Sequence, residues 1–204
     1  MRPFDSFPSN IQNILVMLEE QDRKEREDGL DRLKRLRQIP RETGEFLYQF
    51  LMILVPQYQH FVGLEIGTSG GYSTLWQAMA LVESGKGKLI SLDHDPKKCQ
   101  IASKNIQNTI ASEYITLIQA DAKDYIQKCQ ESIYYVFLDA EKEDYVEFYE
   151  LLVNRLPSGA ILIADNVISH EKDLNDFLNR IQNDQRVSTI ILPVGKGLAL
   201  VRWR

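Results

Sequence analysis

The chain has 204 residues, of which 44% are hydrophobic and 26% are charged, and this composition is typical of a globular protein. Its 29 acidic side chains outnumber its 24 basic ones, so the formal net charge is -5 at pH 7. A negative protein repels phosphate, which argues against a general binder of nucleic acid or anionic membranes but leaves a local basic patch open. The two cysteines, Cys99 and Cys129, form no CxxC pair, which excludes a disulfide framework and a thiolate zinc site. We therefore expect a cytoplasmic protein of one domain with an extension.

The first helices of the chain are expected to be amphipathic. Apolar side chains recur at helical spacing between Ile11 and Leu18, after two residues that favour helix caps. A further helix is expected to begin between Pro40 and Thr43 and to carry large apolar residues as far as Leu54. No leader peptide is expected, because the first ten residues hold charges and prolines where a signal peptide needs an apolar core.

The segment between these helices carries dense charges of both signs. It spans residues 19–37, and Leu30, Leu33 and Leu36 recur in it at three-residue spacing, with Gly29 as a break. We interpret this segment as the solvated face of a helix. A contact with nucleic acid is the alternative, and the interleaving of acids and bases disfavours it.

No membrane span is expected. The longest stretch without a charged residue covers residues 46–64, but it is continuously apolar only over residues 50–55. A spanning helix needs ~20 apolar residues. The stretch is therefore interpreted as a buried helix, and no membrane partner is expected.

Beyond residue 60, seven short apolar runs alternate with helical patterns, as strands do when crossover helices bury both faces of a parallel sheet. The runs cover residues 61–67, 88–93, 114–121, 134–140, 160–166, 188–194 and 198–203. Only Gly-Lys-Gly separates the last two runs, which indicates a hairpin and an antiparallel last strand. The sequence thus predicts an α/β fold: a Rossmann-like, doubly wound, seven-stranded and mostly parallel sheet with helices on both faces and an N-terminal helical extension.

A glycine-rich turn follows the first predicted strand. Gly67, Gly70 and Gly71 leave room for a ligand close to the backbone, and the helix that follows offers free N–H groups. Asp93 ends the second strand, where an acidic side chain accepts hydrogen bonds from ribose hydroxyls in nucleotide-binding folds. The two features together indicate an adenosine-containing cofactor, whereas the turn alone is also explained by tight packing of a strand against a helix. The spacing departs from GxGxxG and Glu65 precedes the turn, so a sulfonium nucleoside fits better than a dinucleotide.

Oxygen-bearing side chains end the fourth and fifth predicted strands. Asp139 and the pair Asp165 and Asn166 are expected at the carboxyl edge of the sheet, where doubly wound folds bind ligands. Two carboxylates and a carboxamide suit Mg²⁺, although Asp-Asn is also a turn-forming pair. Lys142 follows Asp139 by three residues, which is close enough to reach a substrate oxygen bound to the same ion. The alternative interpretation is that Lys142 is a solvated side chain between two glutamates. His170 is a candidate for the substrate pocket.

Five segments together resemble the class I S-adenosylmethionine-dependent O-methyltransferases, and more narrowly the metal-dependent group that contains catechol and caffeoyl-CoA O-methyltransferases (O-methyltransferase family 3). They are LEIGTSGGYSTL, LISLDHDP, VFLDAEKEDY, ILIADNVIS and ILPVGKGLALVRW. The resemblance runs from about residue 39 to the end. It implies a single methyltransferase domain of residues 1–204, in which residues 1–44 form a helical extension or lid and residues 45–204 form the cofactor-binding catalytic core.

The resemblance also implies the site residues and the cofactors, S-adenosyl-L-methionine and Mg²⁺ or another divalent cation such as Mn²⁺ or Ca²⁺. It assigns cofactor binding to Glu65, Gly67, Ser73, Asp93, Asp121, Ala122 and Asp139. In the family, the first three of these positions hold the methionine part, Asp93 the ribose, and Asp121 and Ala122 the adenine. It assigns the metal to Asp139, Asp165 and Asn166, and catalysis to Lys142 and Asp139.

The implied reaction is the methylation of one hydroxyl of a small, catechol-like aromatic substrate with vicinal oxygens, by in-line attack on the sulfonium methyl. Two alternatives remain. One is a tRNA hydroxyuridine O-methyltransferase of the same fold that uses a local basic patch of Arg23, Lys24, Arg26, Lys34, Arg35 and Arg37. The other is a cofactor-binding module without turnover. A homodimer is expected by resemblance. The loop after Asn166 is shorter than in many relatives, so the acceptor, the preferred hydroxyl and the physiological metal stay open.

Overall fold

The structure is a computed structural model that describes residues 2–32 and 34–204. Its α-helices are α1 (Pro3–Ser6), α2 (Ser9–Glu27), α3 (Arg41–Leu54), α4 (Tyr72–Ser84), α5 (Pro96–Ile106), α6 (Ala122–Lys128), α7 (Tyr145–Val153) and α8 (Asn175–Gln182). Three short 3₁₀-helices are η1 (Val55–Gln57), η2 (Ile110–Tyr114) and η3 (Lys142–Asp144). The strands are β1 (Val62–Ile66), β2 (Lys88–Asp93), β3 (Ile115–Gln119), β4 (Tyr135–Leu138), β5 (Ile161–Ala164), β6 (Val187–Leu192) and β7 (Leu198–Trp203). Each strand falls within one of the seven predicted runs or extends it by one residue, and no helix of the described residues is long and apolar enough to cross a membrane.

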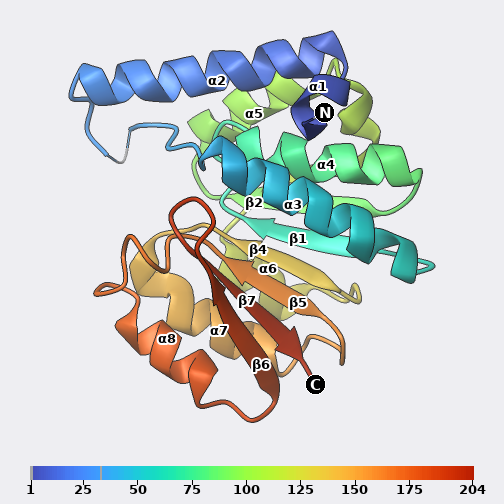
Figure 1. Cartoon of the computed structure of the whole chain (residues 1–204), viewed down its shortest axis with the longest axis vertical. Coiled ribbons are helices and arrows are strands. Elements are labelled where there is room, and N and C mark those ends of the chain that lie inside the picture. Colours follow the sequence, from blue (N-terminus) through green and yellow to red (C-terminus); the bar gives the residue numbers. More distant parts are fainter. Residues whose placement is uncertain (1, 33) are drawn as a thin grey trace.

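The seven strands form one sheet in the order β3-β2-β1-β4-β5-β7-β6. Pairing is parallel from β3 through β5, and β7 runs antiparallel to both of its neighbours, β5 and β6. The predicted fold class and the antiparallel last strand are therefore confirmed. The chain also places β7 between β5 and β6, so that β6 lies at the edge of the sheet (Figure 1).

Helices cover both faces of the sheet (Figure 1). Along β1, Gly63 and Glu65 point toward α4, whereas Leu64 and Ile66 join the apolar layer on the opposite face, because successive residues of a strand alternate in direction. The N-terminal helices and α3 to α5 pack on the first face, and α6 to α8 pack on the second. Burial on both faces is why the strands read as continuous apolar runs.

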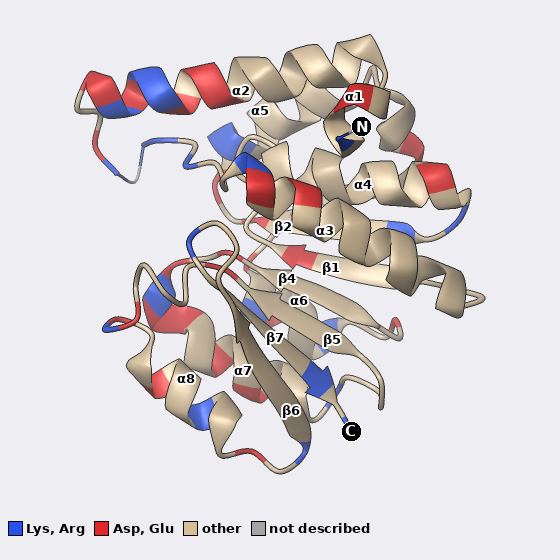
Figure 2. Cartoon of the chain, in the orientation of Figure 1, with Lys and Arg blue, Asp and Glu red and all other residues tan. Residues whose placement is uncertain are grey.

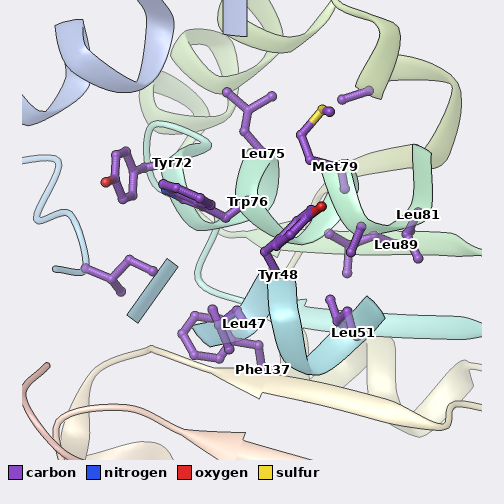
Figure 3. Close-up of a cluster of buried hydrophobic side chains, with 14 of the residues drawn as sticks. Leu47, Tyr48, Leu51, Tyr72, Leu75, Trp76, Met79, Leu81, Leu89 and Phe137 are labelled. Carbon is purple, nitrogen blue, oxygen red and sulfur yellow. The ribbon is translucent and has the colours of Figure 1, made fainter. Parts of the chain in front are cut away.

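Large aromatic side chains fill the layer between α3, α4 and the sheet (Figure 3). Trp76 of α4 is fully buried, and the ring of Phe7 lies 5.1 Å from its ring, centroid to centroid. Tyr48 of α3 also contacts Phe7, at 5.2 Å. This layer fixes the N-terminal extension on the core, since α1 and α2 contribute side chains to the same cluster.

The break expected at Gly29 is confirmed, but the segment after it is not helical, which corrects the interpretation of this part of residues 19–37 as a solvated helical face. Helix α2 ends at Glu27, and Gly29 follows with φ +66°. The chain then crosses the carboxyl edge of the sheet: Leu36 is buried, its N–H donates to the Glu25 carboxylate (2.8 Å) and its carbonyl accepts from Ser69. The burial of Leu36 and the hydrogen bonds of its backbone thus stabilise this stretch in place of the backbone hydrogen bonds of a helix. Leu33, one of the three spaced leucines, lies outside the described residues.

Replacing Gly44 by alanine tests the contact between α3 and α4. Alanine is the better helix former by about 1 kcal/mol, but a Cβ at this position would lie 2.5 Å from the Trp76 ring. Because the ring is fully buried and cannot move freely, we expect Gly44→Ala to lower the free energy of unfolding by about 1–3 kcal/mol in denaturant titrations. The exposed Gln49→Ala of the same helix is the control and should change stability little. A stabilised Gly44→Ala protein would contradict this packing.

Candidate active site

A cavity of about 500 Å³ lies at the carboxyl edge of the sheet. Its lining comes from the ends of β1, β2 and β4, from the loop after β5, and from the segment between α2 and α3 that crosses this edge. Among the predicted site residues, those that line it are Gly67, Ser73, Asp93, Asp121, Ala122, Asp139, Lys142 and Asn166, together with the candidate His170. Glu65 and Asp165 are fully buried and do not line it.

Backbone hydrogen bonds continue the sheet past its strands and fix the edge of the cavity. The N–H of Gly67 donates to Leu92, that of Asp139 to Ile66, and that of Asp165 to Leu138, at 2.9, 3.0 and 3.0 Å. Gly67 has φ +106°, and a Cβ there would lie 2.2 Å from the Asp139 carbonyl oxygen. The glycine is therefore required for close packing of the β1 and β4 ends, and the same residue borders the cavity. The packing interpretation of the turn is thus supported, and the contact with a cofactor stays a prediction.

The cavity end beside β2 suits a nucleoside. Asp93 ends β2, and its carboxylate accepts the Ser69 N–H at 2.8 Å and the Asp95 N–H at 3.0 Å. Asp121 caps α6 by accepting the Lys123 N–H at 2.7 Å. Both carboxylates are thereby held in place at the cavity wall. His94 lines this end as well, and sequence reasoning gave it no role.

Glu65 lies beneath the glycine turn rather than in the cavity. Its carboxylate accepts four side-chain hydrogen bonds, from Ser73 (2.6 Å), Thr74 (2.5 Å), Gln77 (2.6 Å) and Ser91 (2.6 Å). Complete burial raises its pKa to about 7, although all four bonds act in the opposite direction. In this arrangement Glu65 orients Ser73, which does line the cavity, so its link to a cofactor is indirect.

Two carboxylates and an amide meet after β4 and β5. Asn166 has φ +68°, so the backbone has left the strand and both Asp165 and Asn166 turn to the same side. The Asn166 amide donates to Asp165 Oδ2 at 2.8 Å, and the buried Asp165 Oδ1 has no hydrogen-bond partner. Burial and the nearby Asp139 charge raise the pKa of Asp165 to about 7. Within the described residues, no three His, Cys, Asp or Glu side chains cluster to hold a metal, so any such site depends on the Asn166 oxygen.

Lys142 is buried, and the solvated alternative is therefore wrong. Its Nζ donates to Asp139 Oδ1 (3.2 Å), the Ala140 carbonyl (3.0 Å) and the Tyr145 hydroxyl (2.8 Å). The same hydroxyl lies 3.2 Å from the carbonyls that end β4 and begin the loop after β5. Tyr145 thus ties Lys142 to both strand ends. In the sequence, the only pointer to this role of Tyr145 is its position three residues after Lys142, at the start of α7.

Glu141 fastens the segment between α2 and α3 over the cavity. Its carboxylate accepts from Arg37 and, at 3.4 Å, from Arg32, and both guanidinium groups border the cavity. Burial alone would raise the pKa of Glu141, but these two positive charges lower it below its ordinary value. The segment therefore borders the cavity without being helical, and its role as a lid stays a prediction.

Most of the basic residues proposed for RNA contact are engaged with acids. Along the C-terminal half of α2, basic and acidic residues alternate (Figure 2). Arg23 pairs with Glu20 and Glu27, Lys24 with Glu20, Arg26 with Asp22, and Arg37 with Glu141. These pairs reduce the positive field available to phosphates. Contact with tRNA stays a prediction that nothing here tests.

The sheet has one antiparallel strand, β7, which lies next to the edge strand β6. The ligand-sized cavity lies at the ends of β1, β2 and β4. Together these features define a Rossmann-like methyltransferase fold. A family model described as O-methyltransferase matches residues 23–204. The chain belongs to this O-methyltransferase family. The resemblance seen in the sequence is therefore confirmed at the level of the family.

Individual relatives agree with this assignment. A catechol O-methyltransferase from Niastella koreensis is 33% identical over 132 residues, which cover 63% of this chain and 59% of that protein. A flavonoid 3',5'-methyltransferase from Vitis vinifera is 29% identical over 82% of this chain and 79% of its own length. The match thus spans less than two thirds of the Niastella protein. Among solved structures, the O-methyltransferase from Bacillus cereus is similar with a TM-score of 0.77 at 23% identity, covering 97% of this chain and 92% of that one.

The buried Glu65 makes stability depend on pH. Its pKa is about 7 in the folded protein and 4.5 without burial, so the folded state holds a proton that the unfolded state loses between these values. The stabilisation is therefore complete below pH 4.5 and is lost as the pH rises to 7, at about 1.4 kcal/mol per pH unit. We expect Glu65→Gln to flatten this part of the pH dependence in denaturant titrations. An unchanged slope between pH 5 and 7 would show that Glu65 is ionised in the folded protein throughout this range.

Proposed function

We propose that this protein transfers the methyl group of S-adenosylmethionine to one hydroxyl of a small catechol-like aromatic compound, in a reaction that requires a divalent cation. The observation that carries the proposal is the convergence of the glycine turn, the nucleoside-suited Asp93 and the Asp139–Asn166 oxygens on one cavity. The names of the relatives support the acceptor class, since they include catechol, flavonoid and caffeoyl-CoA methyltransferases.

The cofactor would extend along the cavity from β2 to β4. Ser73 and Gly67 border its middle, Asp93 offers carboxylate oxygens to ribose hydroxyls, and Asp121 and Ala122 border the expected adenine end. The fold of this chain is similar to structures described in complex with SAH, from Bacillus cereus, and with SAM, from Streptomyces achromogenes. These complexes support the choice of cofactor.

The residues after β4 and β5 fit a hard divalent cation such as Mg²⁺. Asp165 Oδ1 is a buried carboxylate oxygen with no hydrogen-bond partner, and the nearby Asp139 carboxylate repels it. Asp139, Asp165 and the Asn166 carboxamide would hold the ion, which leaves positions for water or substrate. A bound ion supplies positive charge that binds two vicinal oxygens and lowers the pKa of one hydroxyl.

The chain's own side chains would orient the acceptor and exclude water. The Lys142 ammonium, held by Tyr145 and beside Asp139, is placed to stabilise the acceptor oxygen as its proton leaves. The covering segment, with buried Leu36 and Ile39, removes bulk water from the transfer. Because attack of an oxygen anion on a sulfonium neutralises charge, alignment in this dry cavity carries most of the catalysis. The protein forms no covalent intermediate in this scheme.

We retain three further proposals: a homodimer and a tRNA acceptor as the alternative substrate, which rest on the resemblance, and a cytoplasmic location, which rests on the cysteine content. The tRNA alternative is separated from the leading proposal by including bulk tRNA among the acceptors in transfer assays. Salt-sensitive methylation of tRNA, lost when Lys34 and Arg35 are neutralised, would favour it.

Removal of the cation or of its carboxylates should abolish transfer. We expect a chelator, Asp139→Asn and Asp165→Asn each to lower the rate of catechol methylation more than about a hundredfold, with Mg²⁺ restoring only the chelated wild type. Without metal, Asp165→Asn should also raise the free energy of unfolding by about 1 kcal/mol, because it removes a buried carboxylate that faces a like charge. Transfer that survives both the chelator and Asp139→Asn would refute the role of the metal.

Loss of the Lys142 ammonium should act on the chemical step. We expect Lys142→Met to lower kcat by ~10²–10⁴-fold while the KM for S-adenosylmethionine stays within about threefold, since the lysine contacts Asp139 rather than the nucleoside end. Tyr145→Phe keeps the lysine but removes its hydroxyl partner and should give a smaller loss. Cofactor binding by calorimetry serves as the control for folding. Equal effects on kcat and on cofactor affinity would assign Lys142 a purely structural role.

A further inference from the structure

Lys196 reaches the cavity from a rigid position that the sequence presents only as a hairpin connection. It lies between β6 and β7, flanked by Gly195 and Gly197 with φ +57° and +92°. Its carbonyl accepts the N–H groups of Ile168 (3.2 Å) and Ser169 (3.0 Å), which belong to the loop that follows Asn166. A Cβ at Gly197 would lie 2.3 Å from the Ile168 side chain, so the hairpin tip packs tightly on that loop. The backbone of Lys196 is thereby fixed relative to the candidate metal ligands.

The charge of Lys196 has no opposite charge in contact with it at this end of the cavity. Arg32 and Arg37 share Glu141, and Lys142 is bonded to Asp139. Among the described residues, the half-buried Lys196 side chain has no hydrogen bond or ion pair, and it is close enough to His170 and Asp165 for its charge to act on both. Asp165 does not neutralise it by contact, since its Oδ1 has no partner. A divalent cation on the two carboxylates would make this end more positive still.

A partly buried ammonium without a counter-ion is unfavourable unless a ligand brings the opposite charge. We propose that Lys196 determines acceptor specificity by binding a carboxylate on the acceptor, so that the substrate class is a carboxylated aromatic vicinal diol rather than a neutral catechol. This inference rests on the proposed function. A carboxylate on the acceptor supplies the negative charge that Lys196 lacks. The position of Lys196, beside the Asp139–Asn166 oxygens but not among them, leaves those oxygens for the diol.

Calorimetric binding separates this proposal from turnover. Catechol and 3,4-dihydroxybenzoate share the vicinal diol and differ in one carboxylate, and each is titrated into the protein loaded with S-adenosylhomocysteine and Mg²⁺. We expect the wild type to bind the benzoate at least about tenfold more tightly, and Lys196→Met to lose this preference without a change in its affinity for catechol. Lys196→Arg retains the charge and should retain the preference. Lys172→Met removes an exposed lysine outside the cavity and is the matched control.

Each result decides the question. Equal affinity of the wild type for the two compounds, no binding of either, or a loss on Lys196→Met that is the same for both would overturn the role of Lys196. Methyl transfer is measured on the same proteins. A charge-dependent binding preference without any transfer would refute the proposed function and leave the carboxylate-binding role standing. Transfer to both compounds with equal KM would support the proposed function and refute the carboxylate-binding role of Lys196.

Discussion

The structure depends on the contact between the ends of β1 and β4. β4 pairs with β1 on the side opposite β2, so the chain leaves the sheet in different directions on the two sides of β1 and opens a crevice at this point. Gly67 permits the contact, because a side chain there would strike the Asp139 carbonyl. The crevice then receives a nucleoside-suited acid from β2 on one side and the Asp139 and Asn166 oxygens on the other. Every proposed role of the cavity uses this juxtaposition.

Two buried carboxylates near the crevice show how differently such a group can be accommodated. Glu65 is surrounded by four side-chain donors and therefore needs no further partner. Asp165 accepts one hydrogen bond at Oδ2, and its Oδ1 has no hydrogen-bond partner. The negative charge of Asp139 lies nearby. Burial raises the pKa of both groups to about 7, but only Asp165 has an oxygen left without a partner, which a cation can bind. This difference is the physical reason for placing Glu65 in the scaffold and for proposing Asp165 as a metal ligand.

The strands and the edge at which the site lies could be predicted from the sequence, because burial on both faces leaves continuous apolar runs and parallel strands end together. The place of β7 between β5 and β6 could not, since a hairpin defines only one neighbour. The break near Gly29 could also be predicted, and α2 ends at Glu27, but the burial of Leu36 could not, because it depends on long-range contacts. Lys142 looks solvated between its glutamates. Its burial depends on Tyr145 and on the strand ends that this tyrosine joins.

The covering segment and the Lys142 ammonium are held by adjacent residues. Glu141 binds the two arginines of the segment, and Lys142 binds Asp139 and Tyr145. Because the two residues are consecutive, the position of the segment and the position of the ammonium are constrained by the same short loop after β4. Arg37 adopts φ +45°, a conformation that costs a non-glycine residue energy, and its ion pair with Glu141 offsets that cost. The irregular backbone over the cavity is therefore maintained by contacts with the loop after β4 rather than by helix propensity. This dependence explains why no local sequence pattern predicts that the segment covers the cavity.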